Sequence, residues 1–452
     1  MSVDRKTRRR FLKTAASALA MPAIIPATAI GKGGRPAPSE RIEVGLLGYG
    51  TIAQATTPVF LVDERVQVVA VADPASELTH YGYAGELTGG HAVGKAFVEK
   101  HYAEAKPKGG FKGCTAYEDY RELLEKEDLN AVNISTPDHW HAQMCLDATA
   151  KGLHIYGQKP LALTVKQGRA MADAVAKAGT TWQTGSQQRS DVYFRTACEF
   201  VRNNRIGKVH TVNVYLPGGH KNWSKLGDKK AAAPVPEGLN YDLWQGPAPV
   251  RDYAPALLPL QWRHNYDYSG GMVTDFGAHH IDIVHWALGM DESGPVKLEK
   301  IQGKLPEVKE LYNTATEFHF EAVYGNGTRV VVDNEVSSTG RIIFHGEDGK
   351  SITVTRDNLE MTPAALRREK IREDEVKLYE STNHVGNFID CVYSGKPTVA
   401  PIEAAHRTIT VAHLANIGIR TGKASFVWDP DKEKSTDEEV NHHLDRPARE
   451  AY

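Results

Sequence analysis

Two short apolar runs around a glycine-rich turn constrain this 452-residue chain more than any other feature. Ile42–Leu47 is suited to a buried strand, the turn follows directly, and a helix is expected from about Ile52. Val66–Ala72, which is rich in valine, is suited to a second buried strand. Strands that alternate with helices pair in parallel through right-handed crossovers. The chain after residue 40 is therefore predicted to begin with an α/β domain.

The turn has the spacing G-x-G-x-x-A that is typical of dinucleotide-binding loops. Gly48 permits a tight turn, Gly50 lets a pyrophosphate approach the backbone, and Ala53 lets the helix pack closely on the strand. Asp73 ends the second strand, where a carboxylate can bond both ribose hydroxyls and would repel a 2′-phosphate. NAD is therefore expected rather than NADP; the alternative is a glycine turn with a helix-capping aspartate. The predicted cofactor contacts of this region are Gly48, Gly50, Thr51, Ile52, Ala53 and Asp73.

The composition excludes several classes of partner and site. Hydrophobic residues make up 41% of the chain and charged residues 24%, as in ordinary globular proteins. The net charge is -2 and no basic stripe is present, which argues against nucleic acid as a partner. The four cysteines are widely spaced and form no C-x-x-C pair, so neither a disulfide framework nor a thiolate metal site is expected.

The first 39 residues are expected to be an export signal and a linker. Residues 7–13, with the sequence TRRRFLK, resemble a twin-arginine signal, and an alanine-rich apolar segment follows. That segment contains Pro22 and Pro26 and is short for a stable membrane span. We therefore expect a periplasmic or otherwise exported protein that follows the twin-arginine route. The alternative is a disordered basic tail.

After Pro160 the pattern changes to α+β. Glu317–Tyr324 and Thr328–Val332 alternate like strands and are joined by a Gly-Asn-Gly turn, and a second strand pair is joined through Asp348-Gly349. Both joints are hairpin signals, so a mainly antiparallel sheet is expected. The proline-rich stretch Ala231–Pro259 is predicted to be an irregular surface excursion, and the polar tail is predicted to be peripheral. The predicted segments are 1–39 for signal and linker, 40–161 for the first domain, 162–430 for the second, and 431–452 for the tail.

Three segments together carry a resemblance to a known family. They are STPDHWH at residues 135–141, GQKP at 157–160 and GGMVTDFGAHHID at 270–282. With these motifs in this order, the chain resembles the Gfo/Idh/MocA family of glucose–fructose oxidoreductase and inositol dehydrogenase-like enzymes, from about Ile42 to about Val427. The resemblance implies an N-terminal Rossmann domain that binds NAD(P) and a C-terminal α+β domain with a large open sheet. It also implies an active site between the domains and a homodimer or homotetramer.

The resemblance makes Lys159 the active-site lysine, and Asp275 and His279 the acid and the histidine of a D-x-x-x-H segment. Residues four apart on a helix share one face, so Asp275 and His279 can point into one cleft. Histidine suits proton transfer from a hydroxyl near neutral pH, and Asp275 would orient its ring or bond the substrate. Lys159 would hold the substrate oxygen and stabilise developing negative charge. The alternatives are a satisfied buried histidine and a helix N-cap.

The other predicted contacts are less specific. Gln158 stands where the family usually has glutamate, which removes a negative neighbour from Lys159 but keeps hydrogen-bonding capacity. Arg189 is expected either to contact a ligand or to anchor its loop. No metal is expected, because His139 and His141 lack a third ligand at metal spacing. Further cofactor contacts are predicted at Thr136, Pro137, His141, Gln158, Lys159 and Gln187, and substrate contacts at Arg263, Tyr266 and His280.

Three functions remain open from the sequence. The first is an exported NAD(P)-dependent oxidoreductase that acts on a CH–OH group of a sugar, cyclitol or glycoside. The second is a glycoside-cleaving lyase or hydrolase that uses a tightly bound NAD as an internal hydride shuttle. The third is a non-catalytic sugar-binding protein, against which the intact Lys159, Asp275 and His279 argue. In each case the partner is a small carbohydrate or cyclitol.

Overall fold

The computed structural model describes residues 40–81, 85–105, 113–219, 229–306, 311–335 and 340–450. The predicted export signal and linker, residues 1–39, lie outside these residues. From Ile42 onward the chain forms one compact unit. Within the described residues, no helix has both the length and the apolar character that a membrane crossing requires.

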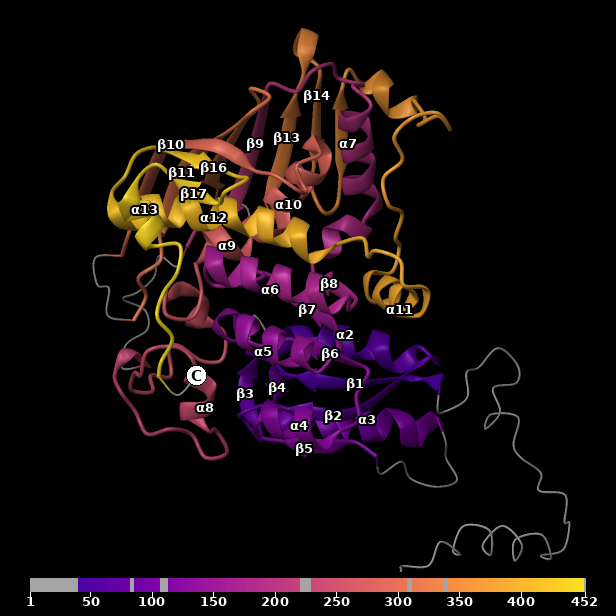
Figure 1. The fold of residues 1–452 in the computed structure, drawn as a ribbon, viewed down its shortest axis with the longest axis vertical. Coiled ribbons are helices and arrows are strands. Elements are labelled where there is room, and N and C mark those ends of the chain that lie inside the picture. Colours follow the sequence, from indigo (N-terminus) through magenta and orange to yellow (C-terminus); the bar gives the residue numbers. More distant parts are fainter. Residues whose placement is uncertain are drawn as a thin grey trace, which may run out of the picture. The chain divides into compact units, whose positions relative to one another are not determined.

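The first half of the chain is built on a six-stranded parallel sheet, shown in indigo and purple in Figure 1. Its strand order is β5-β2-β1-β6-β7-β8. Every pairing is parallel, as predicted from the alternation of strands and helices. The strands are β1 (Ile42–Leu47), β2 (Val66–Ala72), β5 (Thr115–Tyr117), β6 (Ala131–Ile134), β7 (His154–Gly157) and β8 (Trp182–Thr184).

Helices connect these strands. The helices are α2 (Thr51–Val62), α3 (His91–Ala105), α4 (Tyr120–Lys126), α5 (Asp138–Ala150) and α6 (Val165–Ala178). Local chemistry sets their ends: the Thr164 hydroxyl accepts a bond from the Gln167 N–H at 3.1 Å where α6 begins, and Gly179 with φ +68° ends it. A small hairpin, β3 (Leu78–Tyr81) with β4 (Leu87–Gly89), precedes α3 and had no clear signal in the sequence.

The second half is built on a nine-stranded sheet in the order β15-β14-β13-β9-β12-β11-β10-β16-β17. Only the β9–β12 pair is parallel, so the prediction of a mainly antiparallel sheet is confirmed. The strands are β9 (Thr211–Pro217), β10 (Pro295–Lys304), β11 (Glu317–Tyr324), β12 (Arg329–Glu335), β13 (Arg341–His345), β14 (Ser351–Val354), β15 (Leu359–Thr362), β16 (Phe426–Asp429) and β17 (Lys434–Ser435).

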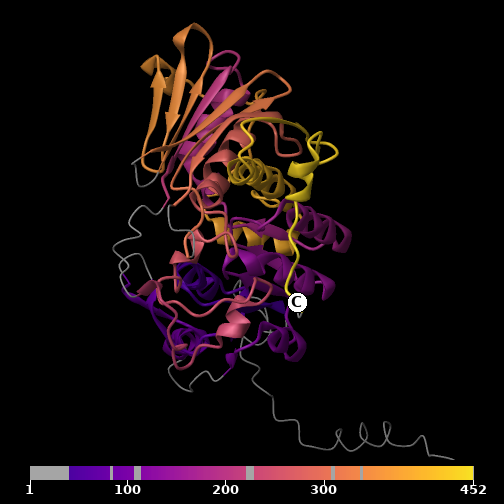
Figure 2. The same cartoon turned by 90° about the vertical axis from the view of Figure 1, so that its left-hand side faces the viewer.

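Helices pack on one face of this sheet (Figures 1 and 2). Along β9, Val212, Val214 and Leu216 are fully buried while the residues between them are partly exposed, which is the alternation of a one-sided sheet. The remaining helices are α7 (Val192–Arg202), α8 (Tyr241–Gln245), α9 (Met272–Asp275), α10 (Gly277–Leu288), α11 (His384–Ser394), α12 (Ile402–Thr421) and α13 (Glu438–His442). The 3₁₀ turns are η4 (Gln187–Ser190), η6 (Gln261–His264), η7 (Glu347–Gly349) and η8 (Ala364–Arg368).

Two expectations about peripheral segments are wrong. The stretch 231–259 is irregular but not a surface excursion, because Trp244, Tyr253 and Leu257 are buried in a cluster with Trp262 and Tyr268. The end of the chain is not peripheral either. Residues 434–444 form β17 and α13, and Val440 and Leu444 are 0% and 4% exposed. In 231–259 the aromatic and aliphatic side chains between the prolines dock the backbone, whereas in the polar tail Val440 and Leu444 do so.

Candidate active site

The glycine turn lies at the carboxyl ends of β1 and β6. The strand order changes direction here, with β2 and β5 on one side of β1 and with β6, β7 and β8 on the other. Gly48 has φ +86°, and a Cβ atom built on it would lie 2.7 Å from the carbonyl oxygen of Ser135. A Cβ atom on Gly50 would lie 3.0 Å from the ring of Tyr81. The turn therefore has room for glycine only at Gly48, and ligands bind in this position in doubly wound sheets.

Asp73 is held rigidly at the end of β2. Its carboxylate accepts the backbone N–H of Tyr49 at 2.8 Å and that of Ala75 at 2.9 Å. Burial raises the pKa of Asp73, whereas these two bonds and the neighbouring His91 oppose the rise. Each carboxylate oxygen retains an acceptor position, so two ribose hydroxyls can still be bound.

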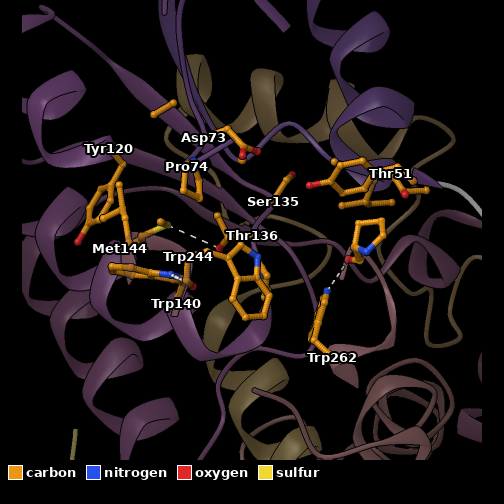
Figure 3. Close-up of a pocket in the computed structure, with 18 of the residues that line it drawn as sticks. Thr51, Asp73, Pro74, Tyr120, Ser135, Thr136, Trp140, Met144, Trp244 and Trp262 are labelled. Atoms are coloured by element: carbon orange, nitrogen blue, oxygen red, sulfur yellow. Dashed lines mark hydrogen bonds between the residues drawn. The ribbon is translucent and has the colours of Figure 1, made fainter. Parts of the chain in front are cut away.

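A pocket of about 780 Å³, including space open to solvent, lies between the turn, Asp73 and the segment before α9. Figure 3 shows the indole rings of Trp140, Trp244 and Trp262 around it, together with Asp73 and Thr136. Of the predicted cofactor residues, those that line this pocket are Gly48, Gly50, Thr51, Ile52, Asp73, Thr136 and Pro137.

These residues fit a dinucleotide. The close approach at Gly48 and the start of α2 leave backbone N–H groups for a diphosphate, and Asp73 offers acceptors for a ribose. The apolar indole walls suit the flat faces of the adenine and nicotinamide rings.

Lys159 and Asp275 form an ion pair, although they are 116 positions apart in the sequence. The Lys159 amine also donates to the backbone carbonyl of Asp275 at 3.2 Å. Burial acts to raise the pKa of the Asp275 carboxyl, but the charges of Lys159 and Arg263 outweigh it, so this pKa lies well below its ordinary value. Asp275 is therefore ionised, and it is the last residue of α9 rather than the N-cap of α10, which is Phe276.

Arg263 connects this ion pair to the cofactor pocket. It lines the pocket, and its Nε lies 3.9 Å from the second carboxylate oxygen of Asp275. Its guanidinium stacks over the ring of Trp262, 4.4 Å from the centroid, and donates to the carbonyl of Leu260 at 3.1 Å. The charge of Arg263 therefore lies at the boundary between the pocket and the ion pair, and its contact with substrate stays a prediction.

The charges of the Lys159–Asp275 ion pair also act on His279. Burial and the charges of Lys159 and Arg356 hold the pKa of His279 well below its ordinary value, against an opposing effect of Asp275. Its Nδ1 is buried and has no hydrogen-bond partner within the described ranges, so it is not a fully satisfied core histidine. Asp275 and His279 lie on two successive helices rather than one, because α9 ends at Asp275 and α10 begins at Gly277.

Two predicted substrate residues do not lie in this pocket. Tyr266 points the other way: its hydroxyl donates to Asn416 at 3.2 Å, and its ring lies beneath Arg420. His280 is completely buried beside Gly340, where a Cβ atom would lie 3.0 Å from its Nε2. Consecutive residues on a helix point in different directions, so His279 and His280 could not share one site.

Several predicted cofactor residues support the pocket from behind. Ala53 is fully buried where α2 packs on the sheet. Gln158 is 4% exposed and is wedged against Gly185, where a Cβ atom would lie 2.4 Å from its Oε1. Gln187 begins η4 and does not line the pocket. The His141 ring lies between two backbone carbonyls, 2.8 Å from that of Pro160 and 2.9 Å from that of Thr136.

Arg189 anchors its loop, which was one of the two alternatives. Its guanidinium binds both oxygens of Asp282 at 2.8 Å and both oxygens of Asp291 at 2.8 and 3.0 Å. His139 also has a structural partner, because its Nε2 lies 3.0 Å from the carbonyl oxygen of Trp244. In the part of the chain that is described, no three His, Cys, Asp or Glu side chains are grouped as metal ligands.

The sequence analysis missed much of the pocket wall. Trp140 and Met144 come from α5, and Leu243 and Trp244 come from α8 within the stretch 231–259. Trp140 was inside a recognised motif, and the aromatic residues of 241–253 were a visible signal in a stretch otherwise rich in proline. The remaining wall residues not predicted are Ala72, Pro74, Tyr81, Glu118, Tyr120, Ser135, Pro259 and Leu260.

Comparison with known families decides the relationship. Residues 199–452 match the C-terminal alpha/beta domain of an oxidoreductase family, and residues 89–186 match its NAD-binding Rossmann fold. The chain belongs to the Gfo/Idh/MocA family. This family member therefore carries an NAD-binding Rossmann domain followed by the family's C-terminal domain, in agreement with the pocket described above.

Relatives of this Gfo/Idh/MocA protein act on carbohydrates. It is 26% identical over 189 residues to levoglucosan dehydrogenase of Pseudarthrobacter phenanthrenivorans, which covers 41% of the chain and 40% of that protein. It is 32% identical over 176 residues to a glycosyl hydrolase family 109 protein of a Shewanella species, which covers 35% of each. The chain thus spans less than half the length of these two relatives.

Solved structures share the fold. A levoglucosan dehydrogenase in complex with NADH and L-sorbose superimposes with a TM-score of 0.57 at 16% identity, over 85% of this chain and 98% of that one. This likeness supports the two-domain architecture of the Gfo/Idh/MocA protein.

Proposed function

We propose that the protein is an NAD-dependent oxidoreductase that acts on a CH–OH group of a sugar, cyclitol or glycoside. One observation carries the proposal: the Lys159–Asp275 ion pair adjoins a dinucleotide pocket through Arg263. The match to levoglucosan dehydrogenase supports a carbohydrate substrate.

Lys159, Asp275 and His279 have different roles in the proposed reaction. NAD bound in the pocket supplies the hydride acceptor. The Lys159 amine holds the substrate oxygen and stabilises the negative charge that develops on it. His279 is neutral near pH 7, so its ring can accept the hydroxyl proton. Asp275 fixes the position of the amine and keeps a negative charge beside it.

A second function has its own support. The match to a glycosyl hydrolase family 109 protein favours glycoside cleavage. With NAD at the site, this cleavage would proceed by transient oxidation of a sugar carbon, bond cleavage and return of the hydride to the same carbon. This use of the site requires a cofactor that stays bound, and the same three residues would serve it.

Two further parts of the proposal concern the cell and the assembly. Export by the twin-arginine route is proposed from residues 7–13, because that route is compatible with a protein that binds its cofactor before it leaves the cytoplasm. A homodimer or homotetramer is proposed because one face of the nine-stranded sheet is covered by helices and the other retains partly exposed residues.

The test begins with the purified full chain. Bound nucleotide is measured first, and sugars and glycosides are then screened with added NAD. NADH that accumulates in proportion to product supports the dehydrogenase, and glycoside cleavage without net NADH supports the internal shuttle. Saturable sugar binding with neither activity would contradict both.

The role of Lys159 is tested with Lys159→Ala. We expect kcat to fall by at least about a hundredfold, because charge stabilisation at the reacting oxygen is lost, while NAD affinity is retained. Lys100→Ala is the matched control, because the Lys100 side chain is 74% exposed on α3. Turnover of Lys159→Ala close to that of the control would refute the assigned role.

A further inference from the structure

A second cavity lies on the far side of the segment that follows Arg263. It measures about 1090 Å³, including space open to solvent, and shares no lining residue with the cofactor pocket. It is bounded by α12, by the segment from Tyr266 to Gly270, and by the end of the chain at residues 442–447. The cavity therefore exists only because the polar tail folds back onto the domain.

Arg446 brings a positive charge to this cavity without a carboxylate partner. Its guanidinium donates to the backbone carbonyls of Tyr266 at 3.0 Å and Asp267 at 2.8 Å. Within the described ranges it forms no ion pair. Burial, assisted by the charge of Arg420, lowers the pKa of Arg446 to about 10, although the charge of Asp267 opposes this. A bound anion would stabilise the charged form of the Arg446 guanidinium, which burial disfavours.

Arg420 contributes a second guanidinium. It stacks on the ring of Tyr266 with its Cζ 4.7 Å from the centroid, and it too forms no ion pair among the residues the structure describes. The stacking holds the guanidinium against the ring, and a guanidinium binds an oxyanion with two parallel hydrogen bonds.

The acidic groups of the cavity, Asp267 and Asp445, both act on Arg446 but offset these charges only in part. Asp267 is paired with Arg251 at 3.0 Å. Asp445 accepts the backbone N–H of Arg446 at 2.9 Å and the hydroxyl of Thr164 at 3.4 Å. One carboxylate therefore stands against the two guanidinium groups of Arg420 and Arg446.

The charge of Arg420 also acts on a histidine that lines the cavity. Burial first, then the charge of Arg420, lower the pKa of His443. Its neighbour His442 is exposed and lies at the mouth of the cavity. Both can donate or accept a hydrogen bond in the neutral form.

The other side chains that line the cavity suit an organic ligand rather than an inorganic ion. They include the ring of Tyr266 and the apolar side chains of Leu163, Pro249, Ile417 and Pro447. We propose that the second cavity binds a sugar-sized molecule that carries an oxyanion, namely a carboxylate or a phosphate, with Arg420 and Arg446 on the oxyanion. The proposal is independent of the redox function.

The test is a calorimetric titration of the full chain saturated with NAD, so that the dinucleotide pocket is already filled. The probes are D-glucuronate, D-glucose 6-phosphate, inorganic phosphate and neutral D-glucose. We expect saturable binding of one or both sugar anions, weaker binding of inorganic phosphate, and no binding of glucose to this cavity. Equal affinity for inorganic phosphate and for the sugar anions would overturn the sugar-sized ligand.

Arg420→Gln is the decisive variant, because Arg420 is exposed and its loss leaves the tail's own hydrogen bonds intact. We expect the affinity for the sugar anion to fall by about tenfold or more. Arg372→Gln is the control, since Arg372 is exposed and lies in neither cavity. Unchanged binding in Arg420→Gln, or no saturable binding at all, would overturn the proposal.

A sugar anion could also enter the proposed active site, so the titration is repeated in Lys159→Ala. Binding that persists there and is lost in Arg420→Gln locates the ligand in the second cavity. Binding lost in Lys159→Ala and kept in Arg420→Gln would place it at the active site and overturn the proposal.

Discussion

At Gly48 the addition of a single methyl group is enough to disturb the cofactor turn. Gly152 has a similar backbone, with φ +73° against +86° at Gly48, but no atom within 4 Å of its ideal Cβ position. The two glycines therefore share the conformational requirement and differ only in their surroundings. An alanine at Gly152 would therefore show the cost of a positive φ alone. An alanine at Gly48 would add the cost of crowding in the turn that a dinucleotide must approach.

We expect Gly48→Ala to weaken NAD binding by at least about tenfold, since the 2.7 Å contact with the Ser135 carbonyl must be relieved by moving the turn. Gly152→Ala should cost about 1 kcal/mol of unfolding free energy from the positive φ alone and leave NAD affinity unchanged. Fluorescence titration with NAD and urea unfolding measure the two effects. Equal NAD affinities in both variants would show that the turn does not hold the diphosphate.

At the scale of elements, one buried cation joins the end of the parallel sheet to the helices of the second half. Arg189 from η4 is 1% exposed, binds Asp282 of α10, and stacks over Trp286 of the same helix with its Cζ 5.3 Å from the centroid. The loop that follows β8 is thereby fixed to the helix that carries His279. Arg189 therefore holds in place the helix that carries His279, without contacting the site itself.

Arg189→Leu should lower the unfolding free energy by about 3–5 kcal/mol, because it leaves the buried Asp282 carboxylate without a counter-charge. Arg372→Leu is the control, since that arginine is exposed and pairs with Asp374 at the surface; it should change little. Urea unfolding followed by circular dichroism gives both values. A loss in Arg189→Leu no larger than in the control would mean that the buried pair contributes nothing.

The stretch 231–259, which is irregular apart from the short helix α8, forms part of the site. The backbone carbonyl of Trp244 accepts the indole N–H of Trp140 at 3.0 Å. Its backbone also turns tightly at Gly246, where a Cβ atom would lie 2.1 Å from the ring of Trp140. Two indoles of the pocket wall are thus positioned by an irregular segment docked on α5.

At the scale of the whole molecule, buried neutral histidines make stability depend on pH. Burial chiefly lowers the pKa of His139 and His280 to about 3, and that of His285, His384 and His413 to about 4. In the unfolded chain a histidine has its ordinary pKa of about 6.5. As the pH falls below that value, the unfolded chain binds protons that the folded protein does not.

We therefore expect the unfolding free energy to decrease from pH 7.5 to pH 5.5 by a few kcal/mol, since each unit of pKa difference corresponds to about 1.4 kcal/mol per group. Asp138, whose pKa burial raises to about 6, opposes this in part, because it gains a proton more readily in the folded protein. Urea unfolding at both pH values measures the change. Stability that is equal or higher at pH 5.5 would contradict the prediction.

Local features were predictable because they depend on neighbouring residues. The bounds of β1, β2 and β11 were predicted to the residue. The hairpin signal at Asp348-Gly349 gave the β13–β14 pairing. The Gly48 turn and Asp73 followed from spacing, since their roles require only a strand, a turn and a helix in order.

What the sequence by itself determined is the fold class, the family and the cofactor turn, because residue spacing and backbone preference specify them locally. Only the tertiary structure decided which distant side chains meet: Lys159 with Asp275, Arg189 with Asp282, and the tail with Tyr266. Such pairs depend on how two sheets and their helices pack over the whole chain, and no local preference encodes that packing. The same packing separated Tyr266 and His280 from the site, buried the stretch 231–259 and created the second cavity.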